Sequence, residues 1–307
     1  MTIHKISGRW RLGLGLSIFA TLLWGILPIA LKAILIALDV YTIIWFRFSI
    51  AFGVLGAYLA FRNQLPARRK LQQWHTLILL LAATGFLGIH YLLFLQGIAL
   101  TSPANAELFD QLGPVLFGLG GLVIFKERYT LTQWAGLSIF TLGFVLFFHE
   151  KLQTIVSTRE IYLLGNIVLI AGAVTLALYA LIQKKLLSQL TSTNIMVFIY
   201  GGCAILFAPF ATPEKLLTLS PVEWAILIFC SFNTLLAFGS FAEALAHWQA
   251  SRVSAVVASA PIVTVIFVSV LSSLAPTLVA AEKFTVLAIF GAVLVVAGSA
   301  AIALGEK

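Results

Sequence analysis

The sequence carries very little charge for its length. Only 10% of its 307 residues are Asp, Glu, Lys or Arg, whereas 61% are hydrophobic, and the mean hydropathy is +1.06. A soluble domain of this size needs far more charge to cover its surface. The scarcity of charge therefore argues against a soluble domain and predicts a protein whose surface faces lipid.

Cysteine is also scarce, and the motifs of common enzyme classes are missing. The only two cysteines, Cys203 and Cys230, lie inside apolar runs, with no CxxC motif and no Cys/His cluster. They exclude a disulfide framework and are read as small buried apolar residues. There is no HExxH, no GxSxG and no Walker lysine after a glycine-rich loop. We therefore expect no metal, no cofactor and no catalytic residues.

What the sequence does contain is long apolar runs. A bilayer core of about 30 Å needs about 20 apolar residues of helix. The N-terminal run is too long for a signal-peptide core and is read as a retained first span. Ten runs meet this description, at residues 12–35, 41–61, 74–99, 103–125, 131–148, 161–182, 193–210, 221–245, 253–275 and 284–304. These runs predict an all-α integral membrane protein with ten transmembrane helices.

The net charge of +8 indicates an orientation rather than a nucleic-acid partner. The positive residues lie in short gaps between apolar runs, as in cytoplasmic loops that face an anionic leaflet. With the N-terminus inside, the external loops hold only Lys151, Arg159, Lys215 and Lys283. Both termini are therefore predicted to be cytoplasmic, in the cell (inner) membrane, with the lipid bilayer and no nucleic acid as partner.

The two halves of the chain show weak internal similarity. Aligning Trp24 with Leu176 places Lys32 on Lys184, and with a small gap Pro114 meets Pro261. Because five spans is an odd number, the second half must be inverted relative to the first. We predict two inverted five-helix repeats, residues 1–150 and 151–307, with the binding site between them near the midplane.

An ordered set of residues along the whole chain resembles the EamA-type permeases of the drug/metabolite transporter superfamily. The set comprises Trp24-Gly25, Lys32, Arg47-Phe48, Ala99-Leu100, Ser102 to Ala106, Pro114, Lys126-Glu127-Arg128, Ala244-Leu245, Ala250-Ser251-Arg252, Pro261, Gly291 and Gly298. The resemblance implies export of amino acids or other small metabolites, without ATP or metal. It also implies a cavity lined by spans one, three, four, six, eight and nine.

Polar residues inside the fourth run are the main candidates for the site. Glu107, Asp110, Gln111 and Pro114 follow an i, i+3, i+4, i+7 spacing and share one helix face. Such a stripe cannot face lipid and should line a cavity. Two carboxylates one turn apart suit proton coupling or recognition of a substrate ammonium group. The alternatives are that Glu107 caps the outer mouth and that Asp110 only pairs with Arg47.

Other polar residues within the spans complete the predicted site. Arg47 needs a partner in the membrane, and we predict a structural ion pair with Asp110 in preference to direct contact with the substrate. Lys32 is expected to reach the outer interface. Cavity positions are predicted for Trp24, His90, Tyr91 and Asn233, although His90 alone is more often a hydrogen-bonded interior residue.

These observations predict a secondary transporter that moves a small metabolite such as an amino acid, with protons as a candidate coupling partner. The resemblance implies that the direction is export. Two other classes stay open. A flippase or channel of the same architecture would need a lateral opening with cations at headgroup depth, or a conductance. A membrane-embedded enzyme would need an acidic or histidine cluster at a loop mouth, and the loops here are short.

Overall fold

The chain is described from a computed structural model, which defines residues 7–64, 73–101, 106, 109–126, 129–156, 160–274 and 285–304. Every regular element in these ranges is helical. The elements are α1 (Trp10–Ile34), α2 (Val40–Phe61), α4 (Trp74–Leu100), α6 (Leu112–Ile124), α7 (Leu131–Val156), α8 (Glu160–Leu186), α9 (Ser192–Phe207), η1 (Ala208–Phe210), η2 (Pro213–Thr218), α10 (Pro221–His247), α11 (Ala250–Val257), α12 (Ala260–Leu274) and α13 (Val286–Leu304).

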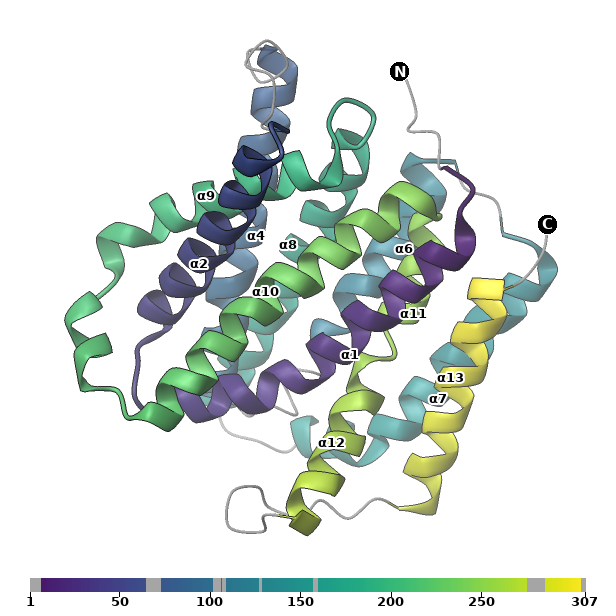
Figure 1. Cartoon of the computed structure of the whole chain (residues 1–307). Helices are drawn as coiled ribbons and strands as arrows, with labels where there is room; N and C mark the ends of the chain where they lie inside the picture. The colour runs from purple at the N-terminus through teal and green to yellow at the C-terminus, as the bar shows by residue number, and fades with distance from the viewer. Residues whose placement is uncertain are drawn as a thin grey trace.

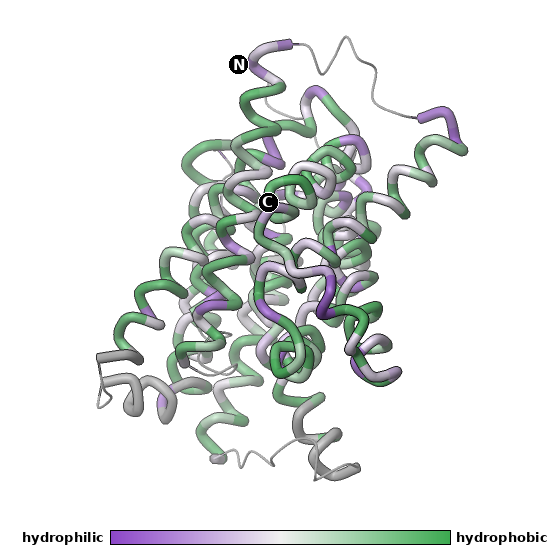
Figure 2. The backbone as a smooth tube through the Cα atoms, turned by 90° about the vertical axis from the view of Figure 1, so that its left-hand side faces the viewer, coloured by the Kyte–Doolittle hydropathy of each residue, from purple (hydrophilic) through white to green (hydrophobic). Residues whose placement is uncertain are grey.

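The helices have the length and the surface of membrane-spanning segments. Within the described ranges, seven are long and apolar enough to cross a membrane, and three shorter apolar ones lie at 112–124, 131–147 and 286–302. Large apolar side chains such as Phe52 and Phe290 are exposed, and hydrophobic residues occur along all the helices (Figure 2). Helices form the hydrogen bonds of their backbone groups internally, so they suit the bilayer core, which offers no hydrogen-bond partners.

Contacts at the helix ends show how the helices are directed. The Ser7 backbone N–H donates to the Ala246 carbonyl at 3.3 Å, so α1 begins where α10 ends. Lys184, near the end of α8, donates to the Trp248 carbonyl at 2.6 Å at the same end of the bundle. Helices α1 and α8, the first of each predicted half, therefore run in opposite directions. Helix α1 begins and α13 ends on one side of the bundle (Figure 1).

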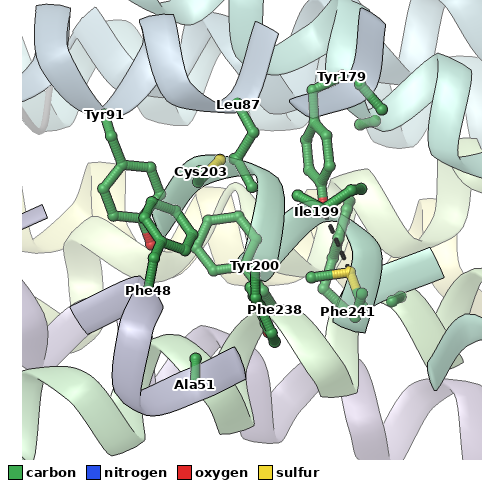
Figure 3. Close-up of a cluster of buried hydrophobic side chains, with 14 of the residues drawn as sticks. Phe48, Ala51, Leu87, Tyr91, Tyr179, Ile199, Tyr200, Cys203, Phe238 and Phe241 are labelled. Atoms are coloured by element: carbon green, nitrogen blue, oxygen red, sulfur yellow. Dashed lines mark hydrogen bonds between the residues drawn. The ribbon is translucent and has the colours of Figure 1, made fainter. Parts of the chain in front are cut away.

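Each half packs against the other rather than folding separately. The most extensive helix pairs are α7 with α13, α4 with α8, α1 with α10 and α2 with α9. The main core lies between α1, α2, α4, α8, α9 and α10 and is rich in aromatic rings, among them Phe48, Tyr91, Tyr200 and Phe238 (Figure 3). Helix α7 extends to Val156, six residues beyond the boundary predicted at residue 150.

Helices α7 and α13 approach more closely than side chains would allow. A Cβ atom built on Gly143 would lie 2.7 Å from the Gly291 carbonyl oxygen, and one built on Gly136 would lie 3.0 Å from the Gly298 carbonyl oxygen. These glycines recur every seven residues on both helices and let the backbones touch, a packing mode common between membrane helices. The pair has small apolar clusters of its own beside the main core.

The fourth and ninth predicted spans are not continuous helices. A turn at Gln111 precedes α6, and a turn at 258–259 separates α11 from α12. Pro114 and Pro261 follow these interruptions at corresponding positions, and proline removes a backbone donor and disfavours helix just before it. Near the second turn, a side chain bonds to a backbone carbonyl group at the end of α11. The Ser299 hydroxyl donates to the Ala255 carbonyl at 2.8 Å.

Candidate functional site

A cavity opens between the two interrupted spans. Its volume is about 620 Å³, including the space at its mouth. It lies toward the ends of α1 and α4 and the start of α6. The lining comes from all six spans implied by the resemblance and from α2 as well. The lining residues are Trp24, Leu27, Pro28, Leu31, Arg47, His90, Tyr91, Phe94, Leu95, Asp110, Gln111, Pro114, Leu176, Phe238, Val257 and Ala260.

Aromatic rings form much of the cavity wall. Trp24 meets Phe238 edge to face, with ring centroids 5.0 Å apart, and Tyr91 lies 5.6 Å from Phe238 and 4.8 Å from Phe48. Figure 3 shows Tyr91, Phe48 and Phe238 grouped in one cluster. Such contacts fix ring positions in addition to burying apolar area, so the wall is preformed on the side of α1, α4 and α10.

Asp110 and His90 form the polar side of the cavity. His90 Nδ1 lies 3.8 Å from Asp110 Oδ1 and donates a hydrogen bond to the Gly172 carbonyl at 3.1 Å. The His90 ring stacks on Phe94, with centroids 5.8 Å apart. The backbone carbonyl fixes the ring orientation and places a proton on Nδ1, the atom that faces the carboxylate. Ionisable residues inside an apolar bundle mark candidate transport sites.

Arg47 does not take the predicted partner. Its side chain is fully buried, and Nε donates to the Cys230 carbonyl at 3.2 Å and to Thr234 Oγ1 at 2.9 Å. Because α2 packs on α9 and α10, the guanidinium group contacts α10 and not Asp110. The predicted ion pair between Arg47 and Asp110 is therefore not formed in this structure, although both residues line the same cavity.

The remaining predicted residues fall in four groups. Gln111 lines the cavity at the turn before α6, as do Trp24 and Tyr91. Asn233 does not line it: its Nδ2 donates to the Leu23 carbonyl at 2.6 Å and ties α10 to α1. The prediction of a cavity role for Asn233 is corrected accordingly. Lys32 is exposed near the end of α1, and Glu107 lies outside the described residues.

Sequence reasoning missed the apolar part of the lining. Phe94, Phe238 and Leu176 face the cavity, but their residue types are the same as those that pack helices together, so composition gives no signal for them. The prolines were the better signal, because interrupted helices at corresponding positions of two halves mark binding sites in transporters. No group of three His, Cys, Asp or Glu side chains suited to a metal occurs within the described ranges.

Comparison with known proteins identifies the family. The model of the EamA-like transporter family matches this chain twice, at residues 11–149 and 163–304. The chain belongs to the EamA-like transporter family. The resemblance seen in the sequence is thus confirmed, and the double match agrees with two related halves. As a member of this family, the chain is a multi-pass membrane transporter for a small molecule.

Relatives of this EamA-like transporter match it over nearly its whole length. It is 36% identical over 296 residues to a protein of Escherichia coli described as an uncharacterized inner membrane transporter, YhbE, covering 96% of this chain and 92% of that one. It is 34% identical over 298 residues to an uncharacterized transporter of Haemophilus influenzae, covering 96% of each. A crystal structure with 19% identity superposes with a TM-score of 0.74 over 95% of this chain and 97% of that one, and shares its fold.

Proposed function

We propose that this EamA-like transporter is a secondary exporter of small metabolites such as amino acids, which works by alternating access and is coupled to protons at Asp110. In this proposal the chain crosses the inner membrane ten times, as two inverted five-helix repeats at residues 1–150 and 151–307, with both termini in the cytoplasm. Seven helices of spanning length, three shorter apolar helices and the opposite directions of α1 and α8 support this arrangement.

The observation that carries the proposal is the position of Asp110. It is a carboxyl group at the interruption of a span, on the wall of an otherwise largely apolar cavity, 3.8 Å from His90. A carboxylate there is stabilised by few groups and can exchange a proton with whichever side of the membrane the cavity faces. When Asp110 is charged it can also bind a substrate ammonium group. Competition between proton and substrate for one carboxylate couples their movements.

The test is substrate flux in proteoliposomes with and without an imposed pH gradient. Radiolabelled leucine and phenylalanine are the first probes, followed by the other amino acids. Asp110→Asn keeps the shape of the side chain, so we expect normal insertion, continued exchange of substrate and loss of the response to the gradient. If Asp110 recognises the ammonium group instead, exchange fails as well. Asp39→Asn, a change to a carboxylate outside the cavity, is the control and should keep the coupled flux.

Two results would contradict the proposal. Gradient-driven transport that persists in Asp110→Asn removes the coupling role. Absence of flux for all amino acids in the wild-type protein removes the substrate class. Recordings that show ion conductance would favour the channel alternative. The flippase alternative gains little support from the two cations predicted within spans, because Arg47 is buried inside the bundle and Lys32 alone of the two is exposed.

A further inference from the structure

In the described part of the chain, two donor atoms of the Arg47 side chain have no partner. Its side chain has no exposed surface, and Nε is bonded to the Cys230 carbonyl and the Thr234 hydroxyl. Nη1 and Nη2 are buried and have no hydrogen-bond partner among the residues that the structure describes. A guanidinium group stays charged in proteins, and a buried charge without its counter-ion is strongly destabilising. The native fold thus retains a costly group that its own contacts leave incomplete.

The Arg47 side chain adjoins the cavity. Arg47 belongs to its lining, and its Cζ atom is 5.0 Å from the centroid of the Tyr91 ring, which also lines it. The two bonds from Nε hold one edge of the guanidinium, and the ring holds one face. The end that carries Nη1 and Nη2 is then a fixed pair of parallel donors. Two parallel N–H groups match the two oxygens of a carboxylate.

The cavity lining also includes an acidic residue. Asp110 and His90 line the cavity too, with His90 Nδ1 3.8 Å from Asp110 Oδ1. Apolar side chains such as Trp24, Phe94 and Phe238 make up much of the remaining wall. Asp110 suits a cationic group, the aromatic wall suits an apolar body, and Arg47 has no anionic partner among the described residues. Each part of a compact zwitterion has a complementary surface.

We propose that Arg47 is a substrate-binding residue, whose Nη1 and Nη2 donate to a carboxylate of the transported molecule. The bound carboxylate supplies a counter-ion, so the substrate neutralises a charge that the described residues of the protein leave unpaired. This inference rests on the proposed function, because it takes the cavity as the transport site, and it adds which group of the substrate is recognised and by which residue.

The test uses binding alone, so that its outcome is independent of flux. The midpoint temperature of unfolding is measured for purified full-length protein with three probes of one shape. Leucine has both charges, 4-methylpentanoate has only the carboxylate, and leucinamide has only the ammonium group. We expect leucine and 4-methylpentanoate to raise the midpoint of the wild-type protein, and leucinamide to raise it much less.

Variants of arginines on α2 assign the effect to one residue. Arg47→Met should abolish the shift produced by both carboxylates, and Arg47→Lys should retain part of it, because an ammonium group keeps the charge but not the paired donors. Arg62→Met is the matched control, since Arg62 is exposed at the end of the same helix, and it should leave all three shifts unchanged. Without any probe, Arg47→Met should unfold at a temperature equal to or higher than the wild-type protein, because it removes a buried unpaired charge.

Three results overturn the inference. They are an equal shift from leucinamide and leucine, a carboxylate shift that survives in Arg47→Met, and no shift from any probe in the wild-type protein. The proposed function fails separately, when the carboxylates bind through Arg47 but leucine flux does not respond to a pH gradient.

Discussion

The Lys184 ammonium group donates hydrogen bonds to the carbonyl oxygens of Leu245 and Trp248, at 2.9 and 2.6 Å, and thereby holds the end of α8 against the end of α10. Lys184 is only 3% exposed. Carbonyl groups at the end of a helix lack intrahelical donors, and the positive charge also complements the negative end of the helix dipole. A residue that resembled an ordinary loop charge in the sequence is thus a buried structural contact.

Replacing this lysine should destabilise the protein. Lys184→Met leaves two carbonyl groups without their donor, and an unsatisfied buried group costs about 1–3 kcal/mol. The melting temperature in detergent should fall by several degrees. Lys185→Met changes the adjacent, less buried lysine and is the control. Equal melting temperatures for the two variants would show that the contacts of Lys184 are not important for stability.

The glycines between α7 and α13 should not tolerate a methyl group. In Gly291→Ala the new Cβ atom would press on the backbone of α7, including the Gly143 oxygen at 2.7 Å, and backbone cannot move aside as a side chain can. Overpacking of this kind costs about 1–3 kcal/mol. The control is Gly53→Ala, where nothing lies within 4 Å of the new atom. Thermal unfolding of both variants should show a lower midpoint for Gly291→Ala alone.

Acid should remove a stabilising contact between the α1–α2 and α9–α10 connections. Burial disfavours the charged form of Asp39, but hydrogen bonds from Thr212, Thr42 and Lys215 outweigh this and lower the pKa of Asp39 from 3.8 to about 2. Because the folded-state pKa is depressed, the stabilisation is fully present above about pH 4 and is lost as the pH falls toward 2.

The variant Asp39→Asn isolates this charge, because asparagine also serves as an N-cap for α2. The wild-type protein should unfold at a higher temperature than the variant at pH 6, and the difference should shrink steadily between pH 4 and pH 2. A difference in melting temperature that is independent of pH would mean that the hydrogen bonds matter and the charge does not.

The proposed orientation can be tested by labelling single cysteines. Both native cysteines are buried, so a new surface cysteine should react selectively with a membrane-impermeant maleimide on intact spheroplasts. Lys215→Cys, in the connection before α10, should be labelled from outside. Asn63→Cys, after α2, should be labelled only after the membrane is opened. The reverse pattern would invert the topology and the predicted direction of export.

The sequence predicted where the helices lie far better than it predicted which side chains contact one another. Apolar runs were enough to locate the helices, because lipid forces the backbone to satisfy itself locally, but the runs at 103–125 and 253–275 were predicted as continuous and their interruptions were not foreseen. Which side chains contact one another depends on how the helices pack, and helix packing cannot be inferred from the pattern of a single sequence. Arg47 was therefore assigned to Asp110, whereas α2 packs on α10, and Asn233 was assigned to the cavity, whereas it bonds to α1.

The opposite directions of α1 and α8 bear on the free-energy difference between the two conformations of the proposed transport cycle. If the two halves had identical sequences, exchanging their conformations would turn a cavity open to one side into the same cavity open to the other, at no cost in free energy. Only positions at which the halves differ can favour one state. Lys32 and Lys184 are such a pair: aligned in sequence, one is exposed and the other is buried against α10. Substitutions at such unequal pairs should shift the balance between the two states without touching the cavity.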